Sequence, residues 1–162
     1  MTTKHQLKVE LPSPTEIRMT RSFDAPRDLV YRVFADHTTH QHWMGCGYGK
    51  VLESTGKPEI GEPWHFRMDM GEHGQMHLFG QCLEAIPNER LVRTFIYDVP
   101  QIRECASVEI CTFSESNGVT TIEVLVQHLS QENRDGHVNS GMEQGAGSSY
   151  DALDRYLAEV DK

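Results

Sequence analysis

The sequence lacks the features of a membrane, secreted or nucleic-acid-binding protein. No stretch approaches the roughly 18 consecutive apolar residues that a spanning helix needs, and the N-terminal segment has no apolar core of a secretory signal. Basic residues are scarce, since 15 Lys and Arg stand against 24 Asp and Glu, giving a net charge of −9, and they form no basic run. We therefore expect neither nucleic acid nor an anionic membrane as a partner.

Redox and cofactor motifs are also missing. The four cysteines are scattered and form no C-x-x-C pair, which predicts reduced thiols in a cytoplasmic protein and not a disulfide framework. The chain has no phosphate loop, no dinucleotide fingerprint and no G-x-S-x-G nucleophile motif. The sequence therefore predicts no cofactor.

The pattern that is present is that of one α+β domain. A length of 162 residues suits a single domain, which we expect over residues 16–162, after a flexible arm or an edge segment over residues 1–15. A strand is expected near residues 16–24, and two short helices follow it, with Pro26 at the first helical position and Asp36 as the second N-cap. About six antiparallel strands joined by hairpin turns come next, one of them over residues 103–114.

The last segment, Arg134 to Val160, is predicted to form one long amphipathic helix. Its apolar stripe would pack through Leu153, Tyr156, Leu157 and Val160. Small residues upstream would leave room beside the sheet: Gly141, Gly145, Ala146 and Ser149. A single sheet must cover one face, and only this helix is long enough to do so. Because a helix cannot fill the whole concavity of a bent sheet, a cavity is expected between them.

Five segments spread along the chain carry a family resemblance: Phe23–Asp36 (FDAPRDLVYRVFAD), His42–Gly45 (HWMG), Gly80–Phe95 (GQCLEAIPNERLVRTF), Gly118–His128 (GVTTIEVLVQH) and Gly141–Leu157 (GMEQGAGSSYDALDRYL). In this order they resemble the START-like (SRPBCC, helix-grip) superfamily, and within it the group similar to the C-terminal domain of the activator of Hsp90 ATPase. The resemblance implies a helix-grip fold, in which a curved antiparallel sheet wraps around a long C-terminal helix and two short helices follow the first strand. Such relatives include lipid and hormone binders, polyketide cyclases and aromatases, and co-chaperones.

Inward-facing methionine and aromatic residues are the strongest functional signal. Residues 62–70 alternate strictly between apolar and polar positions, and Met side chains adapt to irregular ligands. The predicted ligand-binding set is Trp43, Trp64, Phe66, Met68, Met70, Phe79, Phe95, Tyr97, His128, Met142, Gly145, Ala146 and Ser149. Cys82 and Cys111 are further candidates whose facing the pattern leaves open.

His128 is the first candidate for acid–base chemistry. It ends a strand on the same face as Ile122 and Val124, which should point toward the terminal helix, and imidazole titrates near neutral pH. A hydrogen-bonded core histidine and a proton-transferring group both fit this position. Glu84 is a distant second candidate, and no nucleophile accompanies either residue.

The other histidines are expected to be structural. His37, His40 and His42 are spaced like a metal tract, but no carboxylate and cysteine set completes it. We expect a solvated polar helix there and no metal. His65 and His77 are placed to meet across a hairpin, on its solvent side.

The main functional hypothesis is therefore binding of a small hydrophobic or aromatic ligand in a cavity between the sheet and the terminal helix, without chemistry. One alternative is a cyclase or hydrolase that uses His128 as acid or base. Another is an interaction module for an Hsp90-type chaperone, as the resemblance implies. A homodimer also stays open.

Overall fold

A computed structural model describes residues 5–45, 47–98 and 106–161, and in them one antiparallel sheet dominates. The sheet has eight strands in the order β1-β2-β8-β7-β6-β5-β4-β3. The strands are β1 (Lys8–Glu10), β2 (Glu16–Phe23), β3 (Lys50–Gly56), β4 (Pro63–Asp69), β5 (Gln75–Ile86), β6 (Arg90–Tyr97), β7 (Ser107–Ser116) and β8 (Val119–His128). The edge strand β1 lies within the interval expected as an arm or an edge segment.

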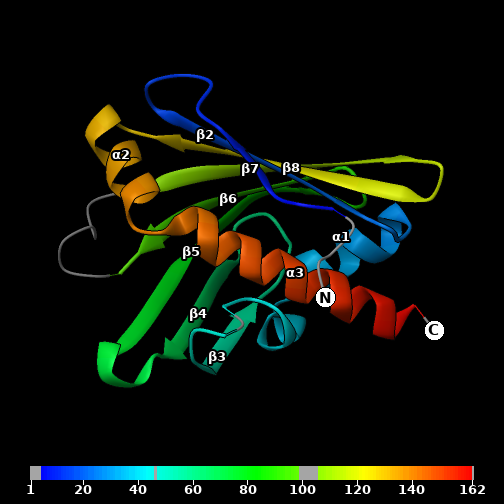
Figure 1. Cartoon of the computed structure of the whole chain (residues 1–162), viewed down its shortest axis with the longest axis horizontal. Coiled ribbons are helices and arrows are strands. Elements are labelled where there is room, and N and C mark those ends of the chain that lie inside the picture. The colour runs from blue at the N-terminus through cyan, green and yellow to red at the C-terminus, as the bar shows by residue number, and fades with distance from the viewer. Residues whose placement is uncertain (1–4, 46, 99–105, 162) are drawn as a thin grey trace.

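The concave side of this sheet is covered by helices, chiefly α1 (Arg27–Ala35) and α3 (Met142–Val160). The other helices are the 3₁₀ helix η1 (His37–His42), α2 (Gln131–Asn139) and the short 3₁₀ helix η2 (Gly71–His73), which joins β4 to β5. In Figure 1, α3 crosses the bent sheet, with β2, β7 and β8 along one side of it and β3 and β4 along the other. Register shifts at Val51/Glu53 and Cys82/Glu84 interrupt the ladders, and such irregularities bend strands. The α+β helix-grip fold expected from the sequence is confirmed.

The terminal helix is two helices, so the prediction of one helix over Arg134–Val160 was wrong. The helix α2 begins earlier, after Ser130, whose hydroxyl accepts a hydrogen bond from the Asn133 backbone N–H at 3.1 Å. The break falls at Gly141, which caps α3 with a φ of 85°. A side chain would strain this left-handed conformation, whereas glycine adopts it freely.

Smaller differences concern the two short helices near the N-terminus. Pro26 is the N-cap of α1 and not its first residue. The second helix is a 3₁₀ helix, and Asp36 caps it as expected by accepting a hydrogen bond from the Thr38 backbone N–H at 2.9 Å. Part of the strand expected over residues 103–114 lies outside the described residues.

The core has two parts on the concave side. The larger cluster joins α1 and α3 to β2, β7 and β8, and it includes Leu153 and Leu157, which are fully buried as expected. Val160, expected in the same stripe, is instead 42% exposed. The smaller cluster consists of Trp64, Phe66, Met68 and Leu78 on β4 and β5. Between the two clusters there is room for a cavity.

Candidate functional site

A cavity of about 370 Å³ lies beneath α3, between the two core clusters. Its wall is built from β2, α1, the segment after η1, the strands β4 to β7 and the helices α2 and α3. The lining residues are Met19, Phe34, Trp43, Met44, Gly45, Tyr48, Met68, Met70, Met76, Leu78, Arg93, Phe95, Tyr97, Glu109, His137, Ser140, Gly141, Met142, Gly145, Ala146, Ser149 and Tyr150. This volume falls in the usual range for small-molecule sites, roughly 300–1,000 Å³.

Methionine dominates the apolar part of the lining. The chain has seven methionines, and all of them except Met1, which lies outside the described residues, line the cavity. One of them is fixed by a polar contact, since the Tyr97 hydroxyl lies 2.9 Å from the Met76 sulfur. Flexible, polarizable thioethers can fit irregular apolar shapes, so this wall can adjust to an occupant.

Most residues of the predicted ligand-binding set line the cavity: Trp43, Met68, Met70, Phe95, Tyr97, Met142, Gly145, Ala146 and Ser149. A Cβ atom built on Gly145 would meet no other atom within 4 Å, so the helix leaves open space there. The Ser149 hydroxyl accepts a hydrogen bond from the Gly45 backbone N–H at 3.0 Å, which ties α3 to the segment after η1. The small residues on α3 therefore serve both spacing and attachment.

Four predicted residues do not line the cavity. Trp64 and Phe66 face inward but lie beneath the lining, and they are 2% and 0% exposed. The Trp64 indole donates a hydrogen bond to the Thr94 carbonyl at 3.1 Å, so it is a structural core residue. His128 lies behind His137, and Phe79 lies on the other face of the sheet. Cys82 and Cys111 are buried outside the lining.

Phe79 was assigned to the wrong face because both faces of β5 carry apolar residues. Its neighbour Leu78 is the inward residue, whereas Phe79 is the ladder partner of His65. The Phe79 ring lies 6.3 Å from the ring of His65 and 5.0 Å from that of His77. These histidines do meet, at 3.3 Å between Nδ1 of His65 and Nε2 of His77, and they are half-buried.

His128 contacts the cavity only through another histidine. Its Nε2 lies 3.1 Å from Nδ1 of His137 on α2, and it is His137 that lines the cavity. Burial, with the nearby His137, lowers the pKa of His128 to about 4. Burial also lowers the pKa of His137. Both rings are therefore uncharged at neutral pH.

Two charged residues inside the cavity were missed by the sequence analysis. Arg93 on β6 and Glu109 on β7 are direct ladder partners, are 5% and 7% exposed, and both line the cavity. Arg93 Nε donates a hydrogen bond to Glu109 Oε2 at 3.2 Å. A signal existed, because Arg93 alternates in phase with Leu91 and Phe95, which marks it as inward-facing.

The histidine tract of η1 is buried rather than solvated, contrary to expectation. His37 and His40 are 6% and 1% exposed, with ring centroids 4.4 Å apart, and only His42 is exposed. Burial lowers the pKa of both His37 and His40 to about 3. No cluster of three or more His, Cys, Asp or Glu residues suited to a metal ion occurs in the described part of the chain.

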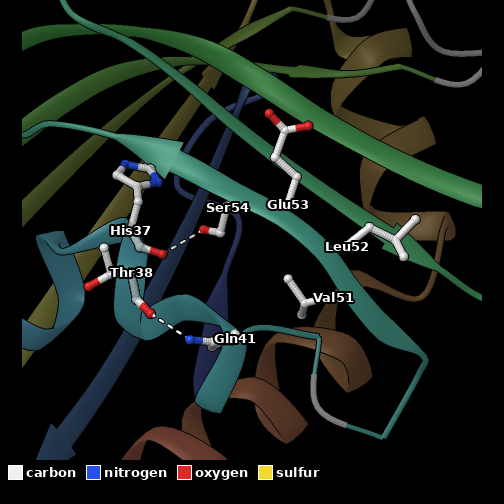
Figure 2. A pocket seen from close by; sticks show the side chains of 7 residues that line it. All are labelled: His37, Thr38, Gln41, Val51, Leu52, Glu53 and Ser54. Atoms are coloured by element: carbon white, nitrogen blue, oxygen red, sulfur yellow. Dashed lines mark hydrogen bonds between the residues drawn. The ribbon is translucent and has the colours of Figure 1, made fainter.

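A second, smaller hollow of about 250 Å³ lies between η1 and β3. Figure 2 shows its lining residues, which include His37, Gln41 and Glu53. The Ser54 hydroxyl on β3 donates a hydrogen bond to the His37 carbonyl on η1 at 2.7 Å. Within η1, the Gln41 side chain donates one to the Thr38 carbonyl at 3.2 Å. This hollow is smaller than the cavity beneath α3 and largely polar. The cavity beneath α3 is therefore the stronger candidate site.

No helix among the described residues is long and apolar enough to cross a membrane. This finding agrees with the absence of a long apolar run in the sequence.

Comparisons with known proteins support the fold over almost the whole chain. A solved structure from Rhodobacter sphaeroides is similar with a TM-score of 0.88 at 20% identity, covering 95% of this chain and 99% of that chain. A solution structure from Arthrobacter aurescens gives 0.83 at 15% identity, covering 94% and 91%. A protein from Nitrosomonas europaea gives 0.80 at 16% identity, covering 93% and 99%. No curated protein matches the sequence.

A family model provides the assignment that these distant structural likenesses cannot. The model described as Activator of Hsp90 ATPase homolog 1-like protein matches residues 24–158. That range includes α1, the strands β3 to β8 and nearly all of α3. The chain therefore belongs to the family of Activator of Hsp90 ATPase homolog 1-like proteins, within the START-like superfamily.

Proposed function

We propose that this protein binds a small hydrophobic or aromatic molecule in the cavity beneath α3. The observation that carries the proposal is the methionine lining, since every methionine of the described residues contributes to this one wall. The six methionines come from both core clusters, since Met19 belongs to the larger and Met68 to the smaller, yet all of them meet at the cavity. Their concentration around a hollow fits a wall that must adapt to an occupant.

The helix supports the same proposal from the opposite side. Its first half presents Gly145, Ala146 and Ser149 to the cavity, while Leu153 and Leu157 farther along pack firmly into the core. Glycine in a helix interior costs about 1 kcal/mol relative to alanine. Open space beside Gly145 is therefore maintained at the expense of helix stability, which is reasonable for a binding site.

Filling this space tests the proposal. The probe is N-phenyl-1-naphthylamine, an uncharged dye that fluoresces in apolar surroundings, titrated into the purified protein. We expect saturable binding to the wild-type protein and a loss of affinity of about ten-fold or more in Gly145→Leu, because the new side chain occupies the cavity.

A matched control lies two residues along the same helix. Gly147 is also half-buried, and a Cβ atom there also meets nothing within 4 Å, but it does not line the cavity. Gly147→Leu should bind the dye like the wild-type protein. Equal dye affinity in both variants, or no saturable binding to the wild-type protein, would refute the proposal.

The enzyme alternative has less support. Its candidate His128 does not line the cavity and would have to act on a bound molecule through His137. The chaperone alternative rests on the family description alone. It predicts that an Hsp90-type chaperone binds the protein equally well in the wild type and in Gly145→Leu, which a pull-down with both proteins measures.

A further inference from the structure

The cavity contains one cation and one anion in an otherwise uncharged lining. Among its lining residues only Arg93 and Glu109 carry a formal charge at neutral pH, since burial keeps His137 uncharged. Burying two charges is costly, and an ion pair compensates this cost only when its geometry and remaining hydrogen bonds are good. The way these two side chains use their polar atoms is therefore informative.

The pair leaves much of its hydrogen-bonding capacity unused. Arg93 donates from Nε to Oε2 of Glu109, and among the described residues neither side chain forms another hydrogen bond. The two terminal nitrogens of the guanidinium and the second carboxylate oxygen thus form no hydrogen bond to the described residues. Buried polar groups normally have partners, so a donor set and an acceptor remain for a molecule in the cavity.

The position of Arg93 is fixed by its aromatic neighbours. Its guanidinium carbon lies 4.5 Å from the centroid of the Trp64 ring and 6.0 Å from that of Phe95. Trp64 is itself held by its hydrogen bond to the Thr94 carbonyl. Such cation–π contacts stabilise a desolvated guanidinium. The charged pair is therefore preorganised before any molecule binds.

Two uncharged donors lie in the same lining. The indole nitrogen of Trp43 is buried without a hydrogen-bond partner among the described residues. Tyr150 is close enough to the pair that Glu109 and Arg93 shift its pKa in opposite directions, while burial, the largest cause, raises it. Tyr150 therefore stays protonated and can donate. The polar part of the cavity combines charge-balanced groups with neutral donors.

We propose that the bound molecule carries, at one end of an apolar body, an uncharged group that both donates and accepts hydrogen bonds, such as a hydroxyl or a carboxamide. This group binds between Arg93 and Glu109, accepting from the guanidinium and donating to the carboxylate. A carboxylate would be attracted by Arg93 but repelled by Glu109. An ammonium group would be attracted by Glu109 but repelled by Arg93. The inference rests on the proposed function, because it describes the polar end of that ligand.

Four probes with the same naphthalene body test it: 2-naphthalenemethanol, 2-methylnaphthalene, 2-naphthoate and protonated 2-(aminomethyl)naphthalene. Dissociation constants come from displacement of N-phenyl-1-naphthylamine. On the wild-type protein we expect the alcohol to bind about ten-fold or more tightly than 2-methylnaphthalene, as hydrogen bonds to charged groups allow. Both charged probes should bind more weakly than the alcohol.

The variant Glu109→Gln keeps the shape of the side chain and removes its charge. The guanidinium is then uncompensated, so we expect the affinity for 2-naphthoate to rise about ten-fold and that for the alcohol to fall. A purely structural role of Glu109 would not produce a gain of carboxylate binding. Glu123→Gln is the control, because Glu123 is an exposed residue paired with Arg18, and it should leave all four affinities unchanged.

The outcomes separate the two proposals. Equal affinities for the alcohol and 2-methylnaphthalene would overturn the polar-end proposal while leaving the binding function intact. No gain of 2-naphthoate affinity in folded Glu109→Gln would also overturn it. Failure of every probe and of the dye to bind the wild-type protein would overturn the proposed function first. The ranking on the wild-type protein remains decisive even where Glu109→Gln does not fold.

Discussion

The buried guanidinium of Arg21 on β2 donates a hydrogen bond to the Asp151 carboxylate on α3 at 2.7 Å, although 130 residues separate them. A second carboxylate, Asp154, lies 3.6 Å from the same guanidinium. The side chain of Arg21 is 1% exposed, so its charge depends on these two partners. Both aspartates lie on α3. They anchor the helix over the concave side of the sheet.

Removing the two negative charges should cost more stability than removing the cation. The double substitution Asp151→Asn/Asp154→Asn leaves a buried, uncompensated charge, and we expect it to lower the free energy of unfolding by about 3 kcal/mol or more. Arg21→Met removes the charge together with its desolvation cost and should lower it by less. Urea unfolding followed by circular dichroism gives both values. A larger loss in Arg21→Met than in the double variant would contradict this reading.

Stability should fall in mildly acidic solution because of His37 and His40. Burial lowers the pKa of each to about 3, whereas in the unfolded chain it is near 6.5. Between these values the unfolded state binds protons that the folded state does not, so stability decreases as the pH falls. Each histidine should contribute up to about 1.4 kcal/mol per pH unit.

Urea unfolding at several pH values between 7 and about 4 measures this dependence. In His37→Phe the slope should decrease by the contribution of one histidine. His42, which is exposed and stacks on Tyr156, provides the control, and His42→Gln should keep the wild-type slope. An unchanged slope in His37→Phe would argue against a buried, uncharged imidazole at this position.

Gly80 should tolerate no side chain. A Cβ atom there would overlap the Thr94 carbonyl and lie 2.8 Å from the Trp64 indole nitrogen. Gly80→Ala must therefore disturb the hydrogen bond between them, and we expect a loss of about 1–3 kcal/mol. Gly147→Ala, in open space on α3, should instead stabilise by up to about 1 kcal/mol. Thermal unfolding compares the two, and a neutral Gly80→Ala would be inconsistent with this close approach.

Cys111 should be unreactive in the folded protein. It is 0% exposed, and burial, with the nearby Glu109, raises its pKa to about 12. Since the thiolate is the reactive form, iodoacetamide should alkylate Cys111 only after unfolding in guanidinium chloride. Mass spectrometry of peptides from native and unfolded samples locates the label. Rapid labelling of native protein at this residue would disagree with the described core.

Sequence periodicity was a good guide where the two faces of a strand differ. In β4 the polar residues Arg67 and Asp69 alternate with apolar ones, and the inward side was predicted correctly. In β5 both faces carry apolar residues, so Phe79 was placed on the wrong face. Periodicity reports contrast between faces, and it carries no information where contrast is absent.

Features that depend on distant partners could not be predicted. The burial of His37 depends on stacking against Trp64, at 5.8 Å between ring centroids. The pairing of Arg93 with Glu109 depends on the register between β6 and β7. The break at Gly141 depends on its positive φ, which a glycine in a helical pattern does not reveal. The first two are set by tertiary contacts, and the third by a local backbone conformation.

The methionines that line the cavity allow the most direct test of ligand binding beneath α3. Protein labelled with ¹³C at the methionine methyl groups is titrated with N-phenyl-1-naphthylamine, and the signals are assigned by single Met→Leu substitutions. We expect the signals of Met19, Met44, Met68, Met70, Met76 and Met142 to shift along one common saturation curve, because all six residues line the cavity. In Gly145→Leu these shifts should largely disappear. Saturable dye fluorescence without any movement of these six signals would place the dye elsewhere and contradict binding beneath α3.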